Sequence, residues 1–447
     1  MKQFLINLNN HIKSLLSIKV LYNSCLILFL ISLTFWHGKL IHFGFIGNKS
    51  VDLLNTIIYP SDILLVLLSI ISLVYLVKNV DRALIYRNRF TLIILLILTI
   101  YFLAPRGTYN LYYEIRLIEY ILCFITFYHV EYHIFAKSLY YLGIVESLIA
   151  IIQFHLKHSI GLHFFGEPLI NAYTDGVAKI DMPNGLKVIR AYGTFNHPNS
   201  LSAFLLLAFA AGLFLVYKNS PKYFIGLFFI FLGLITTFSR AAYLSLFIFI
   251  VIATILLFVK KTVETKKIIV YTAIILVFFG CSLAVYGKYM SKRATIEDSS
   301  TYERIQYDEY GVSLFKNHWL VGSGIGNILY GVAKLVPKDS PDWVIQPPHN
   351  YFEIVSGETG IIGLIIFLLF LLKIFIDYAK ALRDRGPTQK QLELTILFST
   401  FISILLMMQF DHYFYDVPLM ALLFWSFLGI ISGAVSRRKI NAIPLSK

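Results

Sequence analysis

Long apolar runs alternate with short polar segments along the whole chain of 447 residues. About twelve of these runs approach the roughly 20 residues that an α-helix needs to cross a bilayer. The pattern therefore predicts an all-α polytopic membrane protein with about twelve transmembrane helices, and an even number of spans places both termini on the same side. The expected spans lie near residues 20–36, 57–77, 90–104, 112–128, 138–156, 200–217, 222–237, 242–259, 268–286, 351–376, 392–408 and 418–435.

Composition supports the membrane class. Hydrophobic residues make up 57% of the chain and charged residues only 14%, with a mean hydropathy of +0.72. A soluble domain cannot bury that much apolar surface. Cys25, Cys123 and Cys281 all lie inside apolar runs, which argues against a disulfide framework and against a cysteine-based metal site. The first run lacks an A-x-A-like cleavage site, so we expect an uncleaved span.

The formal net charge of +14 is spread through short loops. Clustered basic residues beside membrane spans set orientation, so we predict no nucleic-acid partner. The basic clusters fall at residues 78–89, 260–267, 380–390 and 437–439, all on the same side as the basic N-terminus. By the positive-inside rule that side is cytoplasmic, and both termini are cytoplasmic.

Two segments on the opposite side stand out by their length, at about residues 157–199 and 287–350. The second carries charges of both signs, and residues 302–319 have apolar positions at helical spacing. We therefore expect residues 1–286 to hold nine spans and the outer loop at 157–199. Residues 287–350 should form a small, mostly helical periplasmic cap between spans nine and ten, and residues 351–447 the last three spans and a cytoplasmic tail.

The outer stretch 190–199 reads RAYGTFNHPN and carries Arg190, Asn196 and Asn199. A guanidinium binds phosphate oxygens through two bonds and keeps its charge, and asparagine side chains donate to the same oxygens. These residues are candidate ligands of a phosphate group. The structural alternative is that Arg190 reaches the membrane surface with its charged end while Asn199 caps the following helix.

Arg240 follows Ser239 in a gap of only a few residues between two apolar runs on the outer side. An arginine in so tight a turn at membrane depth is costly unless it meets an anion or a carboxylate. We therefore interpret Arg240 as a second candidate phosphate ligand.

His349 follows two prolines where the 287–350 segment returns to the membrane. Its ordinary pKa lets it accept a proton near neutral pH, as a general base must. Glu353, four residues on, is a candidate for orienting the imidazole. The alternative is that His349 and Asn350 only cap the next span.

The same segment contains Arg304, which is either a third phosphate ligand or a partner of Glu303 or Asp308. Its glycine run at 322–326 lacks a βαβ context and predicts a tight turn rather than a dinucleotide site.

The last outer loop carries Asp411 and Asp416, which either contribute to the site or form a solvated turn. Arg116 lies within the fourth span, and since buried charges are usually paired we expect it to pair with Glu119 or Glu146.

The motifs R-x-Y-G-T-F-x-x-P-N, T-x-S-R-A, G-x-G-x-G-N and P-H-N-x-x-x-x-x-x-x-E-x-G-x-x-G follow one another on outer loops over residues 188–365. In that order the pattern resembles the O-antigen ligase and O-antigen polymerase superfamily. The resemblance implies a membrane glycosyltransferase whose donor is an undecaprenyl-diphosphate-linked glycan.

The resemblance also implies roles for individual residues. Arg190 and Arg240 match the arginines that hold the diphosphate, and His349 matches the histidine that activates the acceptor hydroxyl. Asp411 or Asp416 matches an acidic residue of the final outer loop. The family's asparagines correspond to Asn196, Asn199 and Asn350. The pair Ala241-Ala242 departs from the pattern, because many members carry glycine there, which puts close backbone approach in doubt.

A lipid diphosphate leaves readily when fixed cations neutralise its charge, so the predicted chemistry demands no nucleotide, metal or other cofactor. We predict O-antigen ligation to lipid A-core, in lipopolysaccharide biosynthesis, at the outer face of a bacterial inner membrane. The alternative within the same enzyme class is a polymerase of O-antigen or exopolysaccharide repeat units. A transporter or flippase is the alternative from another class. It is disfavoured because the polar residues gather at the outer edge and not at the midplane.

Overall fold

The computed structural model describes residues 18–79, 89–104, 111–182, 185–294, 299–383 and 388–441. A helix is present at each expected span, and seven of these helices are long and apolar enough to cross a membrane. The predicted membrane class is confirmed, whereas the count of twelve spans stays a prediction. The helices are α2 (Ile18–Ser32), α3 (Pro60–Asn79), α5 (Arg89–Leu103), α6 (Leu111–Phe127), α7 (Tyr132–Leu156), α8 (Pro198–Lys218), α9 (Phe224–Thr236), α10 (Arg240–Lys260), α11 (Thr265–Ala294), α14 (Tyr351–Arg383), α15 (Thr388–Met407) and α17 (Pro418–Asn441).

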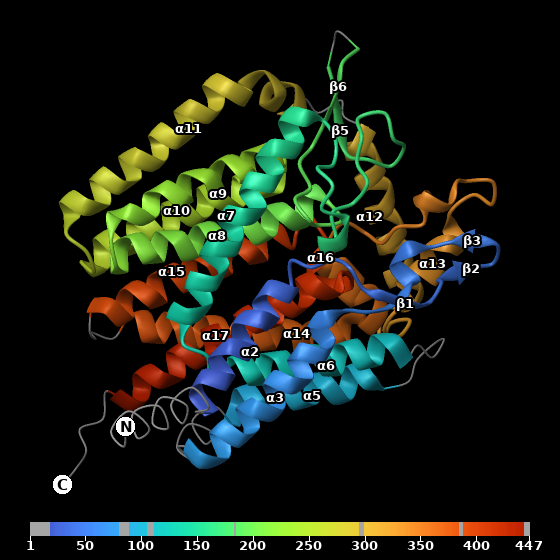
Figure 1. Ribbon diagram of the computed structural model, residues 1–447. Helices are drawn as coiled ribbons and strands as arrows, with labels where there is room; N and C mark the ends of the chain where they lie inside the picture. The colour runs from blue at the N-terminus through green and yellow to red at the C-terminus, as the bar shows by residue number, and fades with distance from the viewer. Residues whose placement is uncertain are drawn as a thin grey trace, which may run out of the picture.

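The helices pack side by side into an elongated bundle (Figure 1). Its centre contains α8 and α17, whose most apolar windows are 94% and 100% buried, while α11 at the edge buries only 22% of its window. The outward side chains of the peripheral helices are apolar, as lipid contact requires. Arg82, Arg87 and Arg385, on which the predicted orientation partly depends, lie outside the described residues.

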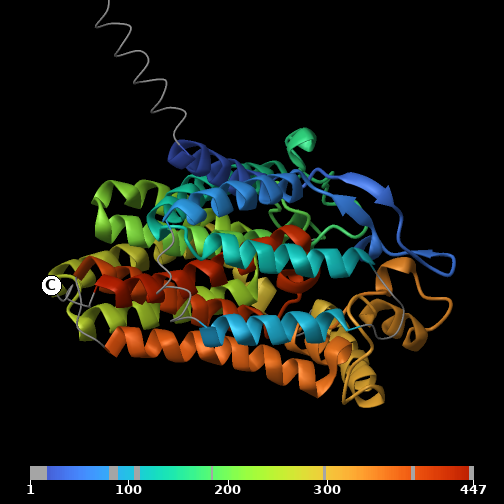
Figure 2. The same cartoon turned by 90° about the horizontal axis from the view of Figure 1, so that it is seen from below.

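One end of the bundle carries the non-spanning elements (Figure 2). They include α12 (Ser299–Asn317), α13 (Ile328–Leu335), α16 (Tyr413–Asp416) and three antiparallel strand pairs. The pairs are β1 (Lys39–His42) with β4 (Thr56–Ile58), β2 (Phe45–Ile46) with β3 (Lys49–Ser50), and β5 (Lys179–Asp181) with β6 (Lys187–Ile189). The strands between α2 and α3 were not expected from the sequence.

A small hydrophobic core joins these strands to the 287–350 segment. Val51 and Leu54, next to β3, pack with Leu314 of α12 and with Ile328 and Val332 of α13. The described part of the segment contains the helices α12 and α13, and both contact the loop between α2 and α3. This contact fixes α12 in place at the end of the bundle.

Helix α14 is broken at Gly360, which has φ 67° and ψ −173°. The glycine run at 322–326 fills the break: the amide of Ser323 donates to the Gly357 carbonyl at 3.0 Å and that of Gly324 to the Glu358 carbonyl at 2.8 Å. Gly322 has φ 76°, and a β-carbon there would lie 2.2 Å from the Glu358 carbonyl. The predicted tight turn is confirmed, because only glycine fits this close approach.

Arg116 lies in a buried ion-pair network on α6. Its NH1 contacts Glu119 Oε2 at 2.6 Å, which confirms one of the two expected pairings. The same guanidinium bonds both oxygens of Asp62, at 2.7 and 3.0 Å, a partner that the sequence did not suggest. The expected pairing with Glu146 is wrong, because that carboxylate accepts hydrogen bonds from Thr194 instead.

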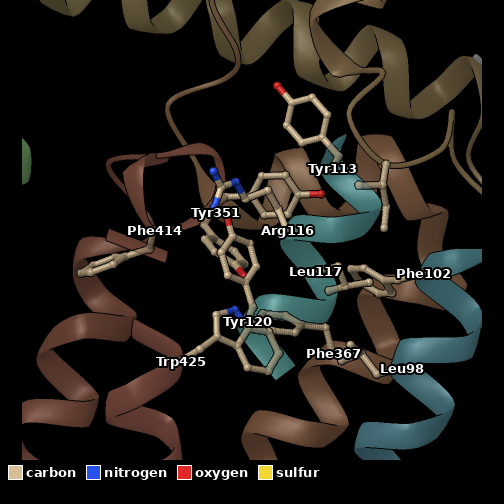
Figure 3. A pocket seen from close by; sticks show the side chains of 12 residues that line it. Leu98, Phe102, Tyr113, Arg116, Leu117, Tyr120, Tyr351, Phe367, Phe414 and Trp425 are labelled. Atoms are coloured by element: carbon tan, nitrogen blue, oxygen red, sulfur yellow. The ribbon is translucent and has the colours of Figure 1, made fainter. Parts of the chain in front are cut away.

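A cavity of about 40 Å³ lies beside Arg116 (Figure 3). Figure 3 shows aromatic side chains from α6, α14 and α17 around it. None of the polar residues proposed above for glycan transfer lines this cavity, so the chemistry must be sought elsewhere. The lining residues are Leu98, Phe102, Tyr113, Arg116, Leu117, Tyr120, Ile325, Tyr351, Phe367, Phe414, Tyr415 and Trp425.

Substitution of Arg116 by alanine should lower the stability of the fold strongly. The change leaves Asp62 buried without its cation, which costs about 3 kcal/mol for a buried pair. Thermal unfolding of the detergent-solubilised protein measures the effect. The control is Lys267→Ala, which breaks an exposed pair with Glu264 at 3.4 Å and should cost less than about 1 kcal/mol. Equal losses from the two changes would contradict this structural role.

Candidate active site

The loop before α8 is held by two polar side chains of α7. Gln153 accepts from the amide of Gly193 at 2.8 Å and donates to the carbonyl of the same residue at 2.8 Å. Glu146, two turns earlier, accepts from the amide of Thr194 at 2.9 Å and from its hydroxyl at 2.8 Å. Gly193 has φ 60°, and a β-carbon there would meet the Glu146 carboxylate at 2.5 Å. The glycine-threonine turn is therefore locked onto α7.

Arg190 precedes this turn and is buried, with 4% of its surface exposed. Its Nε donates to the Thr237 carbonyl at 2.7 Å, and its NH2 donates to Asn199 Oδ1. Within the described residues, NH1 has no hydrogen-bond partner and is available to a ligand. Burial lowers the pKa of Arg190 to about 10, which leaves it charged at neutral pH. The alternative of an arginine that only reaches the membrane surface is wrong.

Asn199 does not cap α8, contrary to the structural alternative. The helix begins at Pro198, and its N-cap is His197, whose Nδ1 accepts from the Asn199 amide at 3.1 Å. Burial, followed by the charge of Arg190, lowers the pKa of His197 to about 3, so the ring is neutral and can accept. The Asn199 side chain instead donates to Asp411 Oδ2 at 2.6 Å. It thus connects Arg190 to the last outer loop.

Asp411 also receives Arg304 of α12. The NH2 group of Arg304 lies 3.5 Å from Asp411 Oδ2, and its NH1 donates to the Phe410 carbonyl at 3.0 Å. The alternative pairing of Arg304 with Glu303 or Asp308 forms no ion pair among the described residues, although the charge of Arg304 acts on Asp308. Asp411 is 4% exposed, so the alternative of a solvated turn is wrong for this residue.

Four arginines lie close enough to interact electrostatically. We call them the arginine cluster: Arg190, Arg240, Arg293 and Arg304. Arg293 interacts electrostatically with the other three arginines. Arg304 also interacts in this way with Arg190 and with Arg240. Arg240 is the first residue of α10, beyond the sharp turn at Phe238, which has φ 49°. Among the residues that the structure describes, Asp411 forms an ion pair with one member of this cluster, Arg304, at 3.5 Å.

Sequence reasoning missed Arg293 as a site residue. The ninth span was expected to end near residue 286, but α11 continues to Ala294 and carries Arg293 to the cluster. The signal that could have found it is the basic pair Lys292-Arg293, because it follows a span on the side where the positive-inside rule expects few basic residues.

His349 and His412, which we call the histidine pair, lie beside Asp411. Their ring centroids are 4.9 Å apart with planes at 88°. His349, Asp411 and His412 each offer one side-chain nitrogen or oxygen atom, and these three atoms all lie within 4.8 Å of one another. Helix α12 fixes His349: Tyr307 stacks on its ring at 5.5 Å, and Asp308 accepts from its backbone amide at 3.3 Å.

The two rings of the histidine pair have opposite electrostatic environments. Burial, followed by the charges of His412 and Arg304, holds the pKa of His349 well below its ordinary value, and its Nδ1 is buried without a partner in the described part of the chain. Burial also opposes the charged form of His412, but the carboxylate of Asp416 outweighs it and raises the pKa of His412. His412 Nδ1 contacts the two oxygens of Asp416 at 2.9 and 2.8 Å.

Three predicted site residues lie apart from this arrangement. Asn350 caps α14, because its Oδ1 accepts from the amides of Phe352 at 2.9 Å and Glu353 at 3.3 Å. Glu353 does not orient His349: its Oε2 has no hydrogen-bond partner among the described residues and faces Gly311 of α12. Asn196 is exposed on the loop.

Comparison with protein families finds one match, to the model described as O-antigen ligase (Wzy_C), over residues 225–368. The matched region contains Arg240, Arg293, Arg304 and His349, and it ends before Asp411 and His412. This match confirms the resemblance that the sequence motifs indicate. A search of curated proteins found no match.

Among solved structures, one match is a chain from work described as structural coordination of polymerization and crosslinking by a peptidoglycan synthase complex. The two chains are 12% identical, and the alignment covers 84% of this chain and 96% of the matched chain, with a TM-score of 0.33. A TM-score this low does not establish a shared fold.

Proposed function

We propose, from the match of residues 225–368 to the O-antigen ligase family model, that the protein transfers a glycan from undecaprenyl-diphosphate to an acceptor sugar. Glycan transfer at a membrane is the function that such a domain supports. The observation that carries the proposal is that Asp411, which contacts Arg304 directly and Arg190 through Asn199, lies beside the ring of His349.

The arginine cluster is suited to the diphosphate. Arg190 is fixed by Thr237 and Asn199 and offers NH1, so it binds one phosphate oxygen with no loss of side-chain freedom. Arg240 stands in the first turn of α10, where the helix dipole adds positive potential. Fixed cations of this kind stabilise the charge that develops as the diphosphate leaves.

His349 is suited to be the base. Its Nδ1 takes the proton of the acceptor hydroxyl, the hydroxyl oxygen bonds the anomeric carbon, and the bond from that carbon to the diphosphate oxygen breaks. A single displacement of this kind inverts the anomeric configuration. The ring is positioned by Tyr307 and Asp308. The predicted positioning by Glu353 forms no part of this proposal.

The ends of the helices support the proposed orientation. Arg240 is the first residue of α10 and Lys260 the last, and α14 likewise runs from Tyr351 beside the site to Arg383. Lys260 and Arg383 therefore lie at the end opposite the site, which the positive-inside rule makes cytoplasmic. We propose a bacterial inner-membrane protein whose site faces the periplasm, with residues 287–350 as its cap.

We propose ligation to lipid A-core first, because the 287–350 segment is large and ends in the proposed base. Polymerisation of repeat units is the second candidate. A broken helix such as α14 is also typical of transporters, where it opens onto a substrate site. Here the amides of Ser323 and Gly324 occupy the carbonyls at the break, which favours a structural role and an enzyme.

The cell-surface glycan of a strain that lacks this protein tests the proposal. Loss of long chains from lipid A-core, with lipid-linked polymer accumulating, is the result expected for a ligase. A single repeat unit on the core indicates the polymerase. Unchanged glycan together with altered solute uptake would refute both enzymes.

Arg240→Lys should reduce transfer although it keeps the positive charge. A lysine is a point cation that cannot reproduce the planar fork of the guanidinium. Loss of a charge-assisted hydrogen bond of about 2 kcal/mol lowers kcat/KM roughly 30-fold. The measurement is transfer by the purified variant, and the control is Lys260→Ala at the other end of α10. Near-normal activity of Arg240→Lys would rule out bidentate binding by this residue.

A further inference from the structure

We propose that His412 is the general acid of this site and that Asp416 is its positioning residue. In this role the protonated His412 donates to the diphosphate oxygen as it leaves, while His349 takes the proton of the acceptor. The inference rests on the proposed function and adds a second catalytic residue that the sequence motifs do not indicate.

The contacts of His412 place it at the diphosphate end of the site. It follows Asp411 directly, and its backbone amide contacts Asp411 Oδ1 at 3.3 Å. That carboxylate holds Arg304 at 3.5 Å, and it holds Asn199, which bonds Arg190. A diphosphate bound by the arginine cluster therefore lies next to the His412 ring.

Asp416 fixes the ring and its protonation. Its carboxylate accepts from Nδ1 at 2.8 Å, so Nδ1 carries a proton and Nε2 is the nitrogen left for a ligand. Nε2 donates only when the ring is charged. Asp416 lies near Glu358 and Tyr415, which hydrogen-bond each other. The Glu358 carboxylate thus accepts from the Tyr415 hydroxyl and does not replace Asp416 as the partner of His412.

The histidine pair divides the two proton-transfer roles. Two imidazolium rings with centroids 4.9 Å apart repel each other, so one ring of the pair stays neutral. The groups facing His412 are Asp416, Asp411, Arg304 and His349, and the two carboxylates favour the charge on this ring. The pKa of His412 is raised and that of His349 is lowered, which matches an acid and a base respectively.

The proton balance closes over one turnover. His349 Nδ1 gains the proton of the acceptor hydroxyl as the new glycosidic bond forms. The electron pair of the broken bond goes to the diphosphate oxygen, which receives the Nε2 proton of His412. The site is left with a charged His349 and a neutral His412, and exchange with solvent restores the starting state.

This division predicts how the site responds to pH. The acid must be protonated, and a raised pKa means that His412 keeps its proton above its ordinary value of 6.5 and loses it as the pH rises further. Binding of the diphosphate should therefore weaken on the alkaline side. The base must be neutral, and a lowered pKa keeps His349 neutral until well below pH 6.5.

The experiment measures binding of undecaprenyl diphosphate, as the probe, to the full chain in lipid nanodiscs from pH 7 to 9.5. Wild-type affinity should fall as the pH rises. His412→Gln should bind about 10-fold more weakly at pH 7 and lose the fall, since one donor to an anion is removed. Asp416→Asn, of the same shape, should move the fall to lower pH.

Two controls separate this inference from the proposed function. His318→Gln, on an exposed residue at the end of α12, should leave the profile unchanged, and His349→Gln should keep the alkaline fall while losing transfer. An unaltered profile in a correctly folded His412→Gln protein would overturn the inference alone. Failure of the wild type to bind the probe at any pH would overturn the proposed function and the inference with it.

Discussion

Replacement of His349 by alanine is expected to abolish glycan transfer while the protein still inserts and folds. The ring is the proposed acceptor of the hydroxyl proton, and a positioned general base contributes about 10³-fold to the rate. Its Nδ1 has no hydrogen-bond partner among the described residues, so its loss breaks no internal contact of that nitrogen. Transfer from the extracted lipid-linked glycan by purified protein measures the effect.

The pH dependence of the wild type provides an independent check on the same residue. Because the pKa of His349 is lowered, its neutral form persists in acid, and transfer should continue below pH 6.5 before it falls. His318→Ala, directly after α12, is the matched histidine control and should retain activity. If His349→Ala still transfers glycan at every pH, the base lies elsewhere, and Asp411 is the next candidate.

The sequence predicted the spanning helices well because each depends on a local property. A run of apolar residues has one stable form in a bilayer, since every backbone amide must be bonded within the segment. Glycine positions were also readable: the run at 322–326 forms the expected turn. The outer strands between α2 and α3 are short. No local hydrophobic periodicity encodes how they pair with each other or how the residues next to them pack against α12.

Partners across the site were not predictable for the same reason. Asn199 and Asp411 are 212 positions apart, and Arg116 and Asp62 are 54 apart, so no spacing rule relates them. Arg116 and Arg240 were recognised as costly in a membrane, yet the partner of such a side chain depends on how the helices pack. Sequence reasoning therefore named Arg190, Arg240, Arg304 and His349 as candidates, left the partner of Arg304 open, and did not name Arg293.

The spacing of four residues shows where a local rule holds. His412 and Asp416 are at i and i+4 and make contact, whereas His349 and Glu353 have the same spacing and do not. His412 has helical backbone angles, φ −109° and ψ −10°, as the residue that opens α16. His349 precedes α14, which begins only at Tyr351, so the helical geometry behind the rule does not apply to it.

Arg190→Lys is expected to lower both activity and stability. The guanidinium of Arg190 bonds Thr237 with Nε and Asn199 with NH2 and keeps NH1 for the diphosphate. A lysine has a single nitrogen for all three partners. Loss of a buried charged hydrogen bond costs about 2 kcal/mol in stability, and loss of the phosphate contact lowers kcat/KM roughly 30-fold.

Thermal unfolding and glycan transfer, measured on the same preparation, test both effects. Lys187→Arg in β6 is the matched control, because it exchanges the same two side chains three residues away on a partly exposed strand. An Arg190→Lys protein with normal stability but no activity would mean that the contacts to Thr237 and Asn199 contribute little to the stability of the fold. Normal activity would contradict the proposal more deeply, because the proposal adds the diphosphate to the two partners, Thr237 and Asn199, that this planar group already bonds.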